Sequence, residues 1–380
     1  MSSQPPHLVL FFTFDVSLEV WKDTGLLSRE VALYQRLIEK GWQVTFVTYG
    51  GRRDLEIAKE IAPIKVITLY NEKPPTRVIV RLLQSPLLVW RARHHLQKAD
   101  VYKTNQIWGG WNAVLAKFFY RRPLIARGGY EPYSFSIFQK YSKLRQWLTK
   151  VTSGWVYRRA EVIFMATQED AQFIVDNFKV DSGKIHIRKN WVDTDLFTSQ
   201  PAQRDPSEIL FIGRMTRQKN LENLFLALKG SSYRLHIVGG GELEENLKAY
   251  ADNNGIKTVF HGRLPNDQLA DFVSSFHVFV LPSLFEGNPK VLLEAMSCGR
   301  AIVGTKVPGI ENLLEDRKNA LMCETDSHSL RKALDELCSN AELRNRLGEE
   351  ARKNIEKTAS LNAYVKDELN FLDKLIYKNG

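Results

Sequence analysis

Short apolar runs rich in β-branched residues alternate with helical patterns along almost the whole 380-residue chain. The runs predict strands near 8–13, 43–48, 65–69, 123–126, 161–165 and 185–188, and again near 208–212, 234–238, 257–260, 277–281 and 301–303. Strands that alternate with helices form parallel sheets covered on both faces. Because one core rarely serves a chain of this length, we expect an α/β protein with two doubly wound, Rossmann-like domains facing a central cleft.

Polar residues and two prolines interrupt this alternation at 199–207 (SQPAQRDPS) and predict a domain boundary there. We expect an N-terminal domain over 1–198, a C-terminal domain over 199–357 and a last helical segment over 358–380. That segment has apolar residues at near-helical spacing, which need a surface to cover: Leu361, Tyr364, Val365, Leu369, Phe371, Leu372 and Leu375. We expect it to return to the first domain.

Cysteine usage and the N-terminal run indicate the compartment. Cys298, Cys323 and Cys338 are an odd number without metal-ligand spacing, which favours a reducing environment. The run at 8–14 follows no Lys or Arg and ends at Asp15, so it resembles a buried strand more than a signal peptide. No segment approaches the ~20 apolar residues of a membrane span. We expect a cytoplasmic protein, either soluble or peripheral on the inner membrane surface.

The segment FVLPSLFEGNPKVLLEAMSCG (279–299) predicts a buried strand, a loop and a helix. Asn288 and Pro289 suit the N-cap and first turn of that helix, whose free N–H groups favour a phosphate or sugar hydroxyls. Gly287 leaves room for close approach. Glu286 and Glu294 would repel a bare phosphate, so they fit better as acceptors for the hydroxyls of a ribose and a hexose. Solvated helix charges are the alternative.

The segment ILFIGRMTRQKN (209–220) places Gly213, Arg214 and Lys219 between a strand and the next helix. Two cations at that position can neutralise a diphosphate and the charge that builds as it departs. The alternative is a solvated basic loop.

A third strand, in LHIVGGGELEENL (235–247), runs into Gly239 and Gly241 before a helix. This pattern suits close backbone approach to a nucleotide phosphate, and an ordinary tight turn is the alternative. Because Glu244 occupies the third glycine position of G-x-G-x-x-G, a nicotinamide site is disfavoured.

In the first half, Gly25 precedes the helical segment LLSREVALYQRLIEKG, and ARGGYEPY (126–133) ends a strand with two glycines and polar and aromatic groups. Ligands of open parallel sheets bind beyond the carboxyl ends of the strands. We therefore expect a second substrate, the acceptor of a transferred group, to bind near Asp15, Arg127, Tyr130 and Glu131.

Together these segments resemble the family-4 retaining glycosyltransferases of the GT-B fold, the glycosyl transferases group 1. The resemblance spans about 8–323 and rests on five motifs: the E-x7-E pair Glu286/Glu294, the glycine and cations of 213–220, LPS at 281–283, EAMSCG at 294–299 and NWVDTDLF at 190–197. It implies the GT-B architecture, with the C-terminal helix packing back on the first domain.

The resemblance also implies roles for individual residues. Arg214 and Lys219 would bind the donor diphosphate, Glu294 the ribose and Glu286 the transferred sugar. Backbone groups of Gly287, Asn288, Pro289 and Lys290 would contact the sugar and phosphate, and the Gly25 loop would cover the diphosphate from the other domain. The donor would be a nucleoside-diphosphate sugar such as a UDP- or GDP-sugar. The reaction would be a metal-independent hexosyl transfer with retention, without a cofactor or protein nucleophile.

Departures from the family pattern keep a second function open. Many relatives carry a histidine after the fourth and fifth strands, where this chain has Lys103-Thr104-Asn105 and Arg127-Gly128-Gly129. Thr24-Gly25 replaces the usual double glycine. The alternative function is a catalytically inactive nucleotide-sugar-binding subunit of a biosynthetic complex.

Positive charge is concentrated in the first half. Residues 1–195 hold 29 Lys/Arg and 18 Asp/Glu, whereas 196–380 hold 24 and 25. Two stretches, 76–98 and 136–159, contain eleven cations and no acidic residue. Such helical surfaces can lie on an anionic membrane, or the charges can simply be solvated; no nucleic-acid motif is present, and we expect no nucleic-acid partner. We expect a glycan or lipid-linked acceptor in polysaccharide, lipopolysaccharide or glycolipid biosynthesis.

Overall fold

A computed structural model describes residues 5–377, which divide into two compact units. The first contains the described residues up to Lys189 together with those from Val365 onward, and the second is Asn190–Tyr364. The sequence places these divisions at 198/199 and 357/358 instead. Val192 explains the earlier start of the second unit, because its N–H donates to Ala359 O (2.9 Å) and its carbonyl accepts from Leu361 N (2.8 Å). The polar 199–207 segment is held on the second unit, where Gln203 N donates to Ser275 O (3.1 Å).

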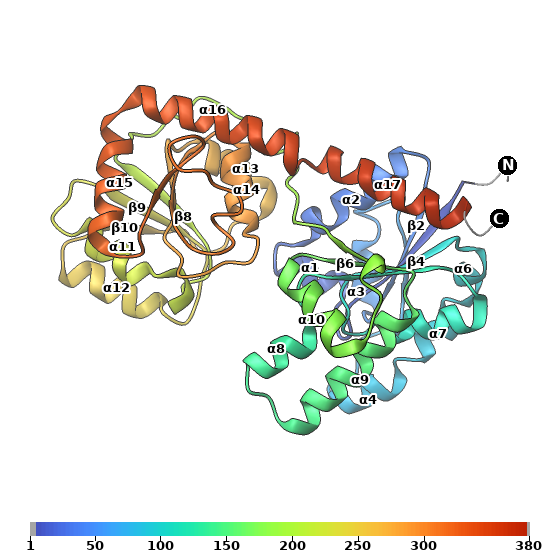
Figure 1. Ribbon diagram of the computed structural model, residues 1–380. Helices are drawn as coiled ribbons and strands as arrows, with labels where there is room; N and C mark the ends of the chain where they lie inside the picture. The colour runs from blue at the N-terminus through green and yellow to red at the C-terminus, as the bar shows by residue number, and fades with distance from the viewer. Residues whose placement is uncertain (1–4, 378–380) are drawn as a thin grey trace. The chain divides into compact units, whose positions relative to one another are not determined.

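The first unit has a seven-stranded parallel sheet in the order β3-β2-β1-β4-β5-β6-β7 (Figure 1). Its strands are β1 (His7–Phe11), β2 (Gln43–Thr48), β3 (Lys65–Thr68), β4 (Val101–Thr104), β5 (Leu124–Gly128), β6 (Val162–Met165) and β7 (Ile185–Ile187). Its helices are α1 (Leu18–Asp23), α2 (Leu27–Glu39), α3 (Arg52–Ile57), α4 (Val78–Gln84), α5 (Leu87–Arg91), α6 (Arg93–Lys98), α7 (Trp111–Tyr120), α8 (Pro132–Phe138), α9 (Lys143–Arg159), α10 (Gln168–Phe178) and most of α17 (Leu361–Tyr377), with a 3-10 turn η1 (Ser182–Lys184).

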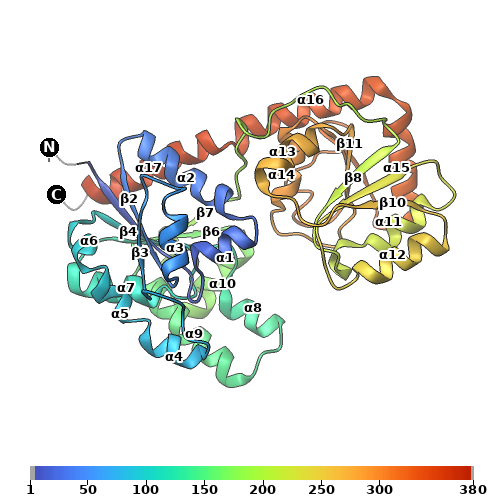
Figure 2. The same cartoon turned by 180° about the vertical axis from the view of Figure 1, so that it is seen from behind.

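The second unit repeats the plan with a six-stranded parallel sheet in the order β10-β9-β8-β11-β12-β13 (Figure 2). The strands are β8 (Glu208–Ile212), β9 (Arg234–Val238), β10 (Lys257–Phe260), β11 (Val278–Leu281), β12 (Ala301–Thr305) and β13 (Leu321–Cys323). Between and after them lie the 3-10 turn η2 (Arg217–Lys219) and the helices α11 (Leu221–Leu228), α12 (Glu244–Asn253), α13 (Asn266–Ser274), α14 (Lys290–Ser297), α15 (Ser327–Ser339) and α16 (Ala341–Thr358). The predicted α/β class with two doubly wound sheets is confirmed.

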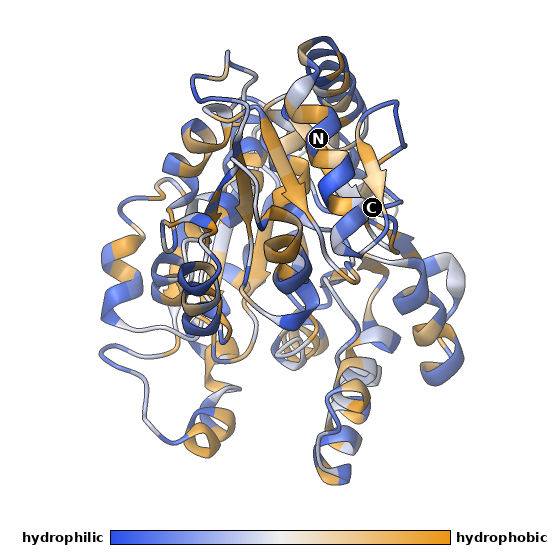
Figure 3. Ribbon diagram, turned by 90° about the vertical axis from the view of Figure 1, so that its left-hand side faces the viewer, coloured by the Kyte–Doolittle hydropathy of each residue, from blue (hydrophilic) through white to orange (hydrophobic). Residues whose placement is uncertain are grey.

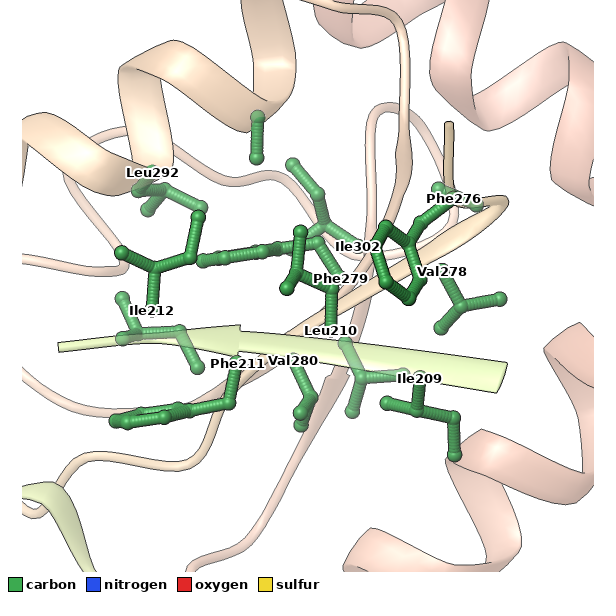
Figure 4. Close-up of a cluster of buried hydrophobic side chains, with 14 of the residues drawn as sticks. Ile209, Leu210, Phe211, Ile212, Phe276, Val278, Phe279, Val280, Leu292 and Ile302 are labelled. Carbon is green, nitrogen blue, oxygen red and sulfur yellow. The ribbon is translucent and has the colours of Figure 1, made fainter. Parts of the chain in front are cut away.

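The core of the second unit forms around the neighbouring strands β8 and β11, which pair Ile209 with Val278 and Leu210 with Phe279. Both strands are continuous apolar runs because helices cover both faces of the sheet. Figure 4 shows these side chains packed with Leu292 of α14. In Figure 3 the strands are mainly hydrophobic, while the helices carry both colours along their turns.

Two strands, β4 and β13, were not among the predicted runs. The first, VYKT, is fully buried but contains Lys103. This charged residue interrupts the apolar pattern by which a buried strand is recognised. The second is only three residues long. A short run gives too little periodicity to separate strand from loop.

Helix α17 packs in the first unit, as predicted from its apolar stripe, and Figures 1 and 2 show it beside α2. Phe371 lies edge-to-face with Phe164 of β6 (5.0 Å between ring centroids) and 4.7 Å from the His186 ring of β7. None of the described helices is long and apolar enough to cross a bilayer.

Candidate active site

Two turns at the carboxyl edge of the second sheet bring Lys219 and Glu286 together. One turn follows β8 and the other follows β11, and because these strands are adjacent and parallel their carboxyl ends share one edge. The Nζ of Lys219 donates to Oε1 of Glu286, although 67 residues separate them. Their side chains are 10% and 7% exposed, so water screens the ion pair only weakly.

Neutral donors fix the Glu286 carboxylate further. Ser283 Oγ donates to the same Oε1 (2.6 Å). Thr305 Oγ1 at the end of β12 in turn donates to Ser283 O (2.6 Å). Since Glu286 N also donates to Pro308 O (3.2 Å), both the backbone and the side chain of this residue are held in place.

The two turns are also hydrogen-bonded to each other through Gln218 and Asn220. Leu284 N donates to Gln218 O, and Gln218 Nε2 donates back to Phe285 O, both at 2.9 Å. Asn220, in the left-handed region at φ 54°, donates from Nδ2 to Pro282 O (3.0 Å). The cation and the carboxylate therefore sit on one preorganised scaffold.

The predicted glycines approach one another closely. Gly239 has φ 133°, and a Cβ there would lie 2.0 Å from Gly213 O. A Cβ on Gly241 would lie 2.4 Å from Met215 O. The loop after β9 thus packs directly on the loop after β8, and this packing requires glycine whether or not a phosphate binds there.

Helix α14 begins at Lys290 with Pro289 as its N-cap, one residue later than predicted. Asn288 precedes the cap: its carbonyl accepts from Asn190 Nδ2 (2.7 Å), and its Oδ1 is buried without a hydrogen-bond partner among the described residues. Glu294 lies within the helix and is only 3% exposed, so it is not a solvated surface charge.

Gly309 supports the Glu286 loop and was not predicted from the sequence. It has φ 84°, and a Cβ there would lie 2.1 Å from Glu286 O and 2.7 Å from Gly287 O. The signal was the VPG sequence at 307–309, which begins two residues after the end of β12. Only glycine lets this turn support the carbonyls of the Glu286 loop.

Arg214 and Gly287 remain open to a ligand. Arg214 follows β8 and is exposed, so its guanidinium is accessible to a ligand. Gly287 is exposed and a Cβ there would meet nothing within 4 Å, which leaves space beside its backbone.

In the first unit, Asp15 lines a pocket of about 640 Å³ beyond the ends of β1, β2 and β3. Its carboxylate forms a two-point ion pair with Arg81 of α4, with Nε–Oδ1 at 2.6 Å and Nη2–Oδ2 at 2.7 Å. Charged groups of both signs line this pocket, among them Arg52 and Glu72. Gly25 does not follow β1 directly, because α1 intervenes; its φ of 71° serves the turn between α1 and α2.

The other predicted acceptor residues have different surroundings. Arg127 donates from Nη1 to Asn105 O (3.1 Å), and Tyr130 is exposed beside Phe135. Glu131 is fully buried, where it caps α8 by accepting from Ser134 N (2.5 Å).

Glu131 is therefore a structural group rather than a contact for an acceptor. Its Oε1 accepts from the buried Tyr157 hydroxyl (3.2 Å). Burial raises the pKa of this carboxyl to about 7 despite these hydrogen bonds.

Comparison with known proteins identifies two family models along the chain. The model of glycosyltransferase family 4 matches residues 31–196, and that of glycosyl transferases group 1 matches residues 193–354. An uncharacterized glycosyltransferase of Methanocaldococcus jannaschii is 30% identical over 146 residues, which are 38% of this chain and 42% of that protein. An alpha-maltose-1-phosphate synthase of Mycolicibacterium smegmatis is 29% identical over 39% of this chain and 44% of its own. The chain matches less than two thirds of the length of such curated relatives.

Solved structures match the fold over nearly the whole chain. HepE of Anabaena, in complex with UDP and glucose, has a TM-score of 0.72 at 16% identity and covers 96% of this chain and 99% of its own. The sucrose-phosphate synthase of Thermosynechococcus elongatus has a TM-score of 0.74 at 16% identity, with 98% and 100% covered. At these identities the likeness shows the fold alone.

Proposed function

Because this chain belongs to family 4 of the GT-B glycosyltransferases, we propose that it moves a hexose from a nucleoside-diphosphate sugar to a glycan or lipid-linked acceptor, with retention. The observation that carries this proposal is the shielded ion pair between Lys219 and Glu286. The pair places a cation that can bind phosphate next to a carboxylate that can accept hydrogen bonds from sugar hydroxyls.

Each donor part has a matching group. Lys219 has two further ammonium protons besides the one given to Glu286, and with the exposed Arg214 it offers positive charge to a diphosphate. Glu286 would accept from hydroxyls of the transferred sugar, and Glu294 from the ribose. The exposed backbone at Gly287 and the first turn of α14 would supply N–H donors to the sugar and phosphate.

The chemistry needs no protein nucleophile. The bond between the anomeric carbon and the diphosphate oxygen breaks, and the acceptor oxygen bonds to that carbon from the same face. The acceptor's hydroxyl proton passes to the departing phosphate. Lys219 and Arg214 would stabilise the charge that builds on this leaving group, which makes the transfer independent of a metal ion.

Structural relatives support a uridine nucleotide and a role in glycan assembly. The Anabaena protein binds UDP and glucose, and the lipopolysaccharide outer core galactosyltransferase WaaB has a TM-score of 0.62 over 98% of this chain. We propose UDP-sugars as the first donors to test, and a polysaccharide, lipopolysaccharide or glycolipid as the product.

For the acceptor we propose the pocket beside Asp15. Its mixed charges suit a hydroxyl-rich glycan, because Asp15 and Glu72 can accept from hydroxyls while Arg52 and Arg81 can donate. A lipid-linked acceptor would place the reaction at the cytoplasmic face of a membrane.

The test is donor hydrolysis and transfer with a panel of nucleotide sugars, comparing wild type with Lys219→Ala, Glu286→Gln and the double variant. Loss of one preorganised charge typically costs ~10²–10³ in rate. Because the two groups act as a unit, the double variant should lose little more than either single variant.

Arg217→Ala is the matched control, since Arg217 lies in the same 3-10 turn but is exposed. It should keep near wild-type turnover. Wild-type rates in Lys219→Ala and Glu286→Gln would refute the site. A wild-type protein that is stabilised by nucleotide sugars yet hydrolyses and transfers none of them would be the inactive binding subunit instead.

A further inference from the structure

The first half of helix α9 presents its apolar stripe to solvent instead of to the core. Leu144, Trp147, Leu148 and Val151 follow the i, i+3, i+4, i+7 spacing of one helix face, and they are 68%, 59%, 44% and 46% exposed. On the opposite side of this stretch the buried residue is polar, Thr149. A helix on a globular protein normally does the reverse, so this stripe calls for a partner that is itself apolar.

The stripe continues over the tip of the α8–α9 hairpin. Helix α8 packs against α9 and ends at Phe138, which is 71% exposed. The connecting turn passes through Lys140 at φ 52°. The hairpin therefore exposes Phe138 at its tip and Trp147 on α9. Both residue types favour a membrane–water interface.

The hairpin itself carries cations beside this apolar face and no acidic residue after Glu131. Lys140, Lys143 and Arg145 are exposed, and Arg145 stacks over the Tyr141 ring at 3.7 Å. No Asp or Glu occurs in 132–160. The preceding acidic residue, Glu131, is fully buried and adds no charge to the surface.

A second helix of the same unit has the same character. Helix α4 buries none of its residues, and Ile79, Leu82 and Leu83 are all exposed. Residues 73–99 contain no acidic residue either. Between these segments, α7 packs against both α5 and α9 and exposes Phe118 and Phe119. Exposed apolar residues therefore occur on three helices of this unit, α4, α7 and α9.

We infer that the α8–α9 hairpin docks this unit on an anionic lipid bilayer, with Phe138, Leu144 and Trp147 among the acyl chains and Lys140, Lys143 and Arg145 at the head groups. Apolar insertion and attraction to anionic lipid then act together. A second copy of the chain fits poorly, because pairing two such faces would bring like charges together. The lipid contact goes beyond the proposed function, since it does not require transfer to occur.

Vesicle sedimentation of the full chain tests the inference, using phosphatidylcholine alone or mixed with phosphatidylglycerol. Wild type should sediment with the mixed vesicles at low salt, and should bind far less to neutral vesicles or at high salt. Lys143→Glu/Arg145→Glu should weaken binding at least about fivefold for each residue changed. Trp147→Ser/Leu148→Ser should weaken it about tenfold or more, because apolar area no longer enters the bilayer.

Matched controls come from the second unit. Leu226→Ser removes an exposed leucine of α11, and Lys229→Glu reverses an exposed lysine after it, and neither should change binding. Donor hydrolysis should stay at wild-type rates in all of these variants, so a failure of docking is distinguishable from a failure of the proposed function.

Three outcomes would overturn the inference. One is a wild-type protein that does not sediment with phosphatidylglycerol vesicles at low salt. Another is hairpin variants that bind as tightly as the controls. The third is a wild-type dimer in light scattering that Trp147→Ser/Leu148→Ser dissociates while vesicle binding is unchanged, which would make the stripe a contact between copies.

Discussion

The Nζ of Lys103 and the Oε1 of Glu368 form an ion pair in which both side chains are completely buried, although 265 residues separate them. Arg188 of the first unit adds a second cation to the other carboxylate oxygen. Burial lowers the pKa of Lys103 to about 8, and the two cations lower that of Glu368 against the effect of its own burial. This cluster ties α17 to β4 within the first unit.

Removing the Glu368 carboxylate should lower the free energy of unfolding more than removing one of the two cations. Glu368→Gln leaves Lys103 and Arg188 buried without a counter-charge, and breaking such a pair costs about 3–5 kcal/mol. Lys103→Met leaves Arg188 paired with Glu368, so we expect a smaller loss. Urea unfolding measures both variants, and equal losses would contradict this division of charge.

Gly309→Ala should reduce donor binding through the Glu286 loop. The new Cβ would collide with Glu286 O and force the loop outward. Gly255→Ala is the control, because Gly255 also has a positive φ (62°) but no atom lies within 4 Å of its added Cβ. Both variants should lose roughly 1 kcal/mol of stability from the left-handed backbone. Only Gly309→Ala should also lose thermal stabilisation by a UDP-sugar, and intact stabilisation would contradict the supporting role.

Glu131→Gln should remove a pH dependence of stability between about 4.5 and 7. The folded-state pKa of Glu131 is raised to about 7, so the native state holds its proton more tightly than the unfolded state. That contribution is fully present below pH 4.5 and is lost as pH rises through 7, by up to about 3 kcal/mol.

The measurement is the difference in free energy of unfolding between wild type and Glu131→Gln across this pH range. His7 and His236, whose burial lowers their pKa to about 4, act in the opposite direction but occur in both proteins and cancel. The exposed Glu169→Gln should follow the wild type. A flat difference for Glu131→Gln would show that burial does not perturb this carboxyl.

Local sequence alone determined the alternation of strands and helices and the motifs that we propose for the donor site. The runs that form β8, β9 and β11 are continuous and apolar because both faces of a parallel sheet are covered. Such runs can be recognised directly in the amino-acid sequence. The spacing that leads from β8 to Lys219 and from β11 to Glu286 follows from the same pattern. Parallel neighbouring strands then leave their loops at one edge, so the proximity of these two side chains was predictable once the order of strands was known.

Only the tertiary structure decided which polar and apolar residues are inside. The sequence suggests a loop carboxylate at Glu131, which is a buried helix cap. It suggests a break in an apolar run at Lys103, which lies in a buried strand and pairs with Glu368. The stripe from Leu144 to Val151 has the spacing of a core-facing helix and is exposed. A helical period shows that one face is apolar but not what it faces. The partner of a side chain is set by contacts tens or hundreds of residues away, which local patterns do not contain.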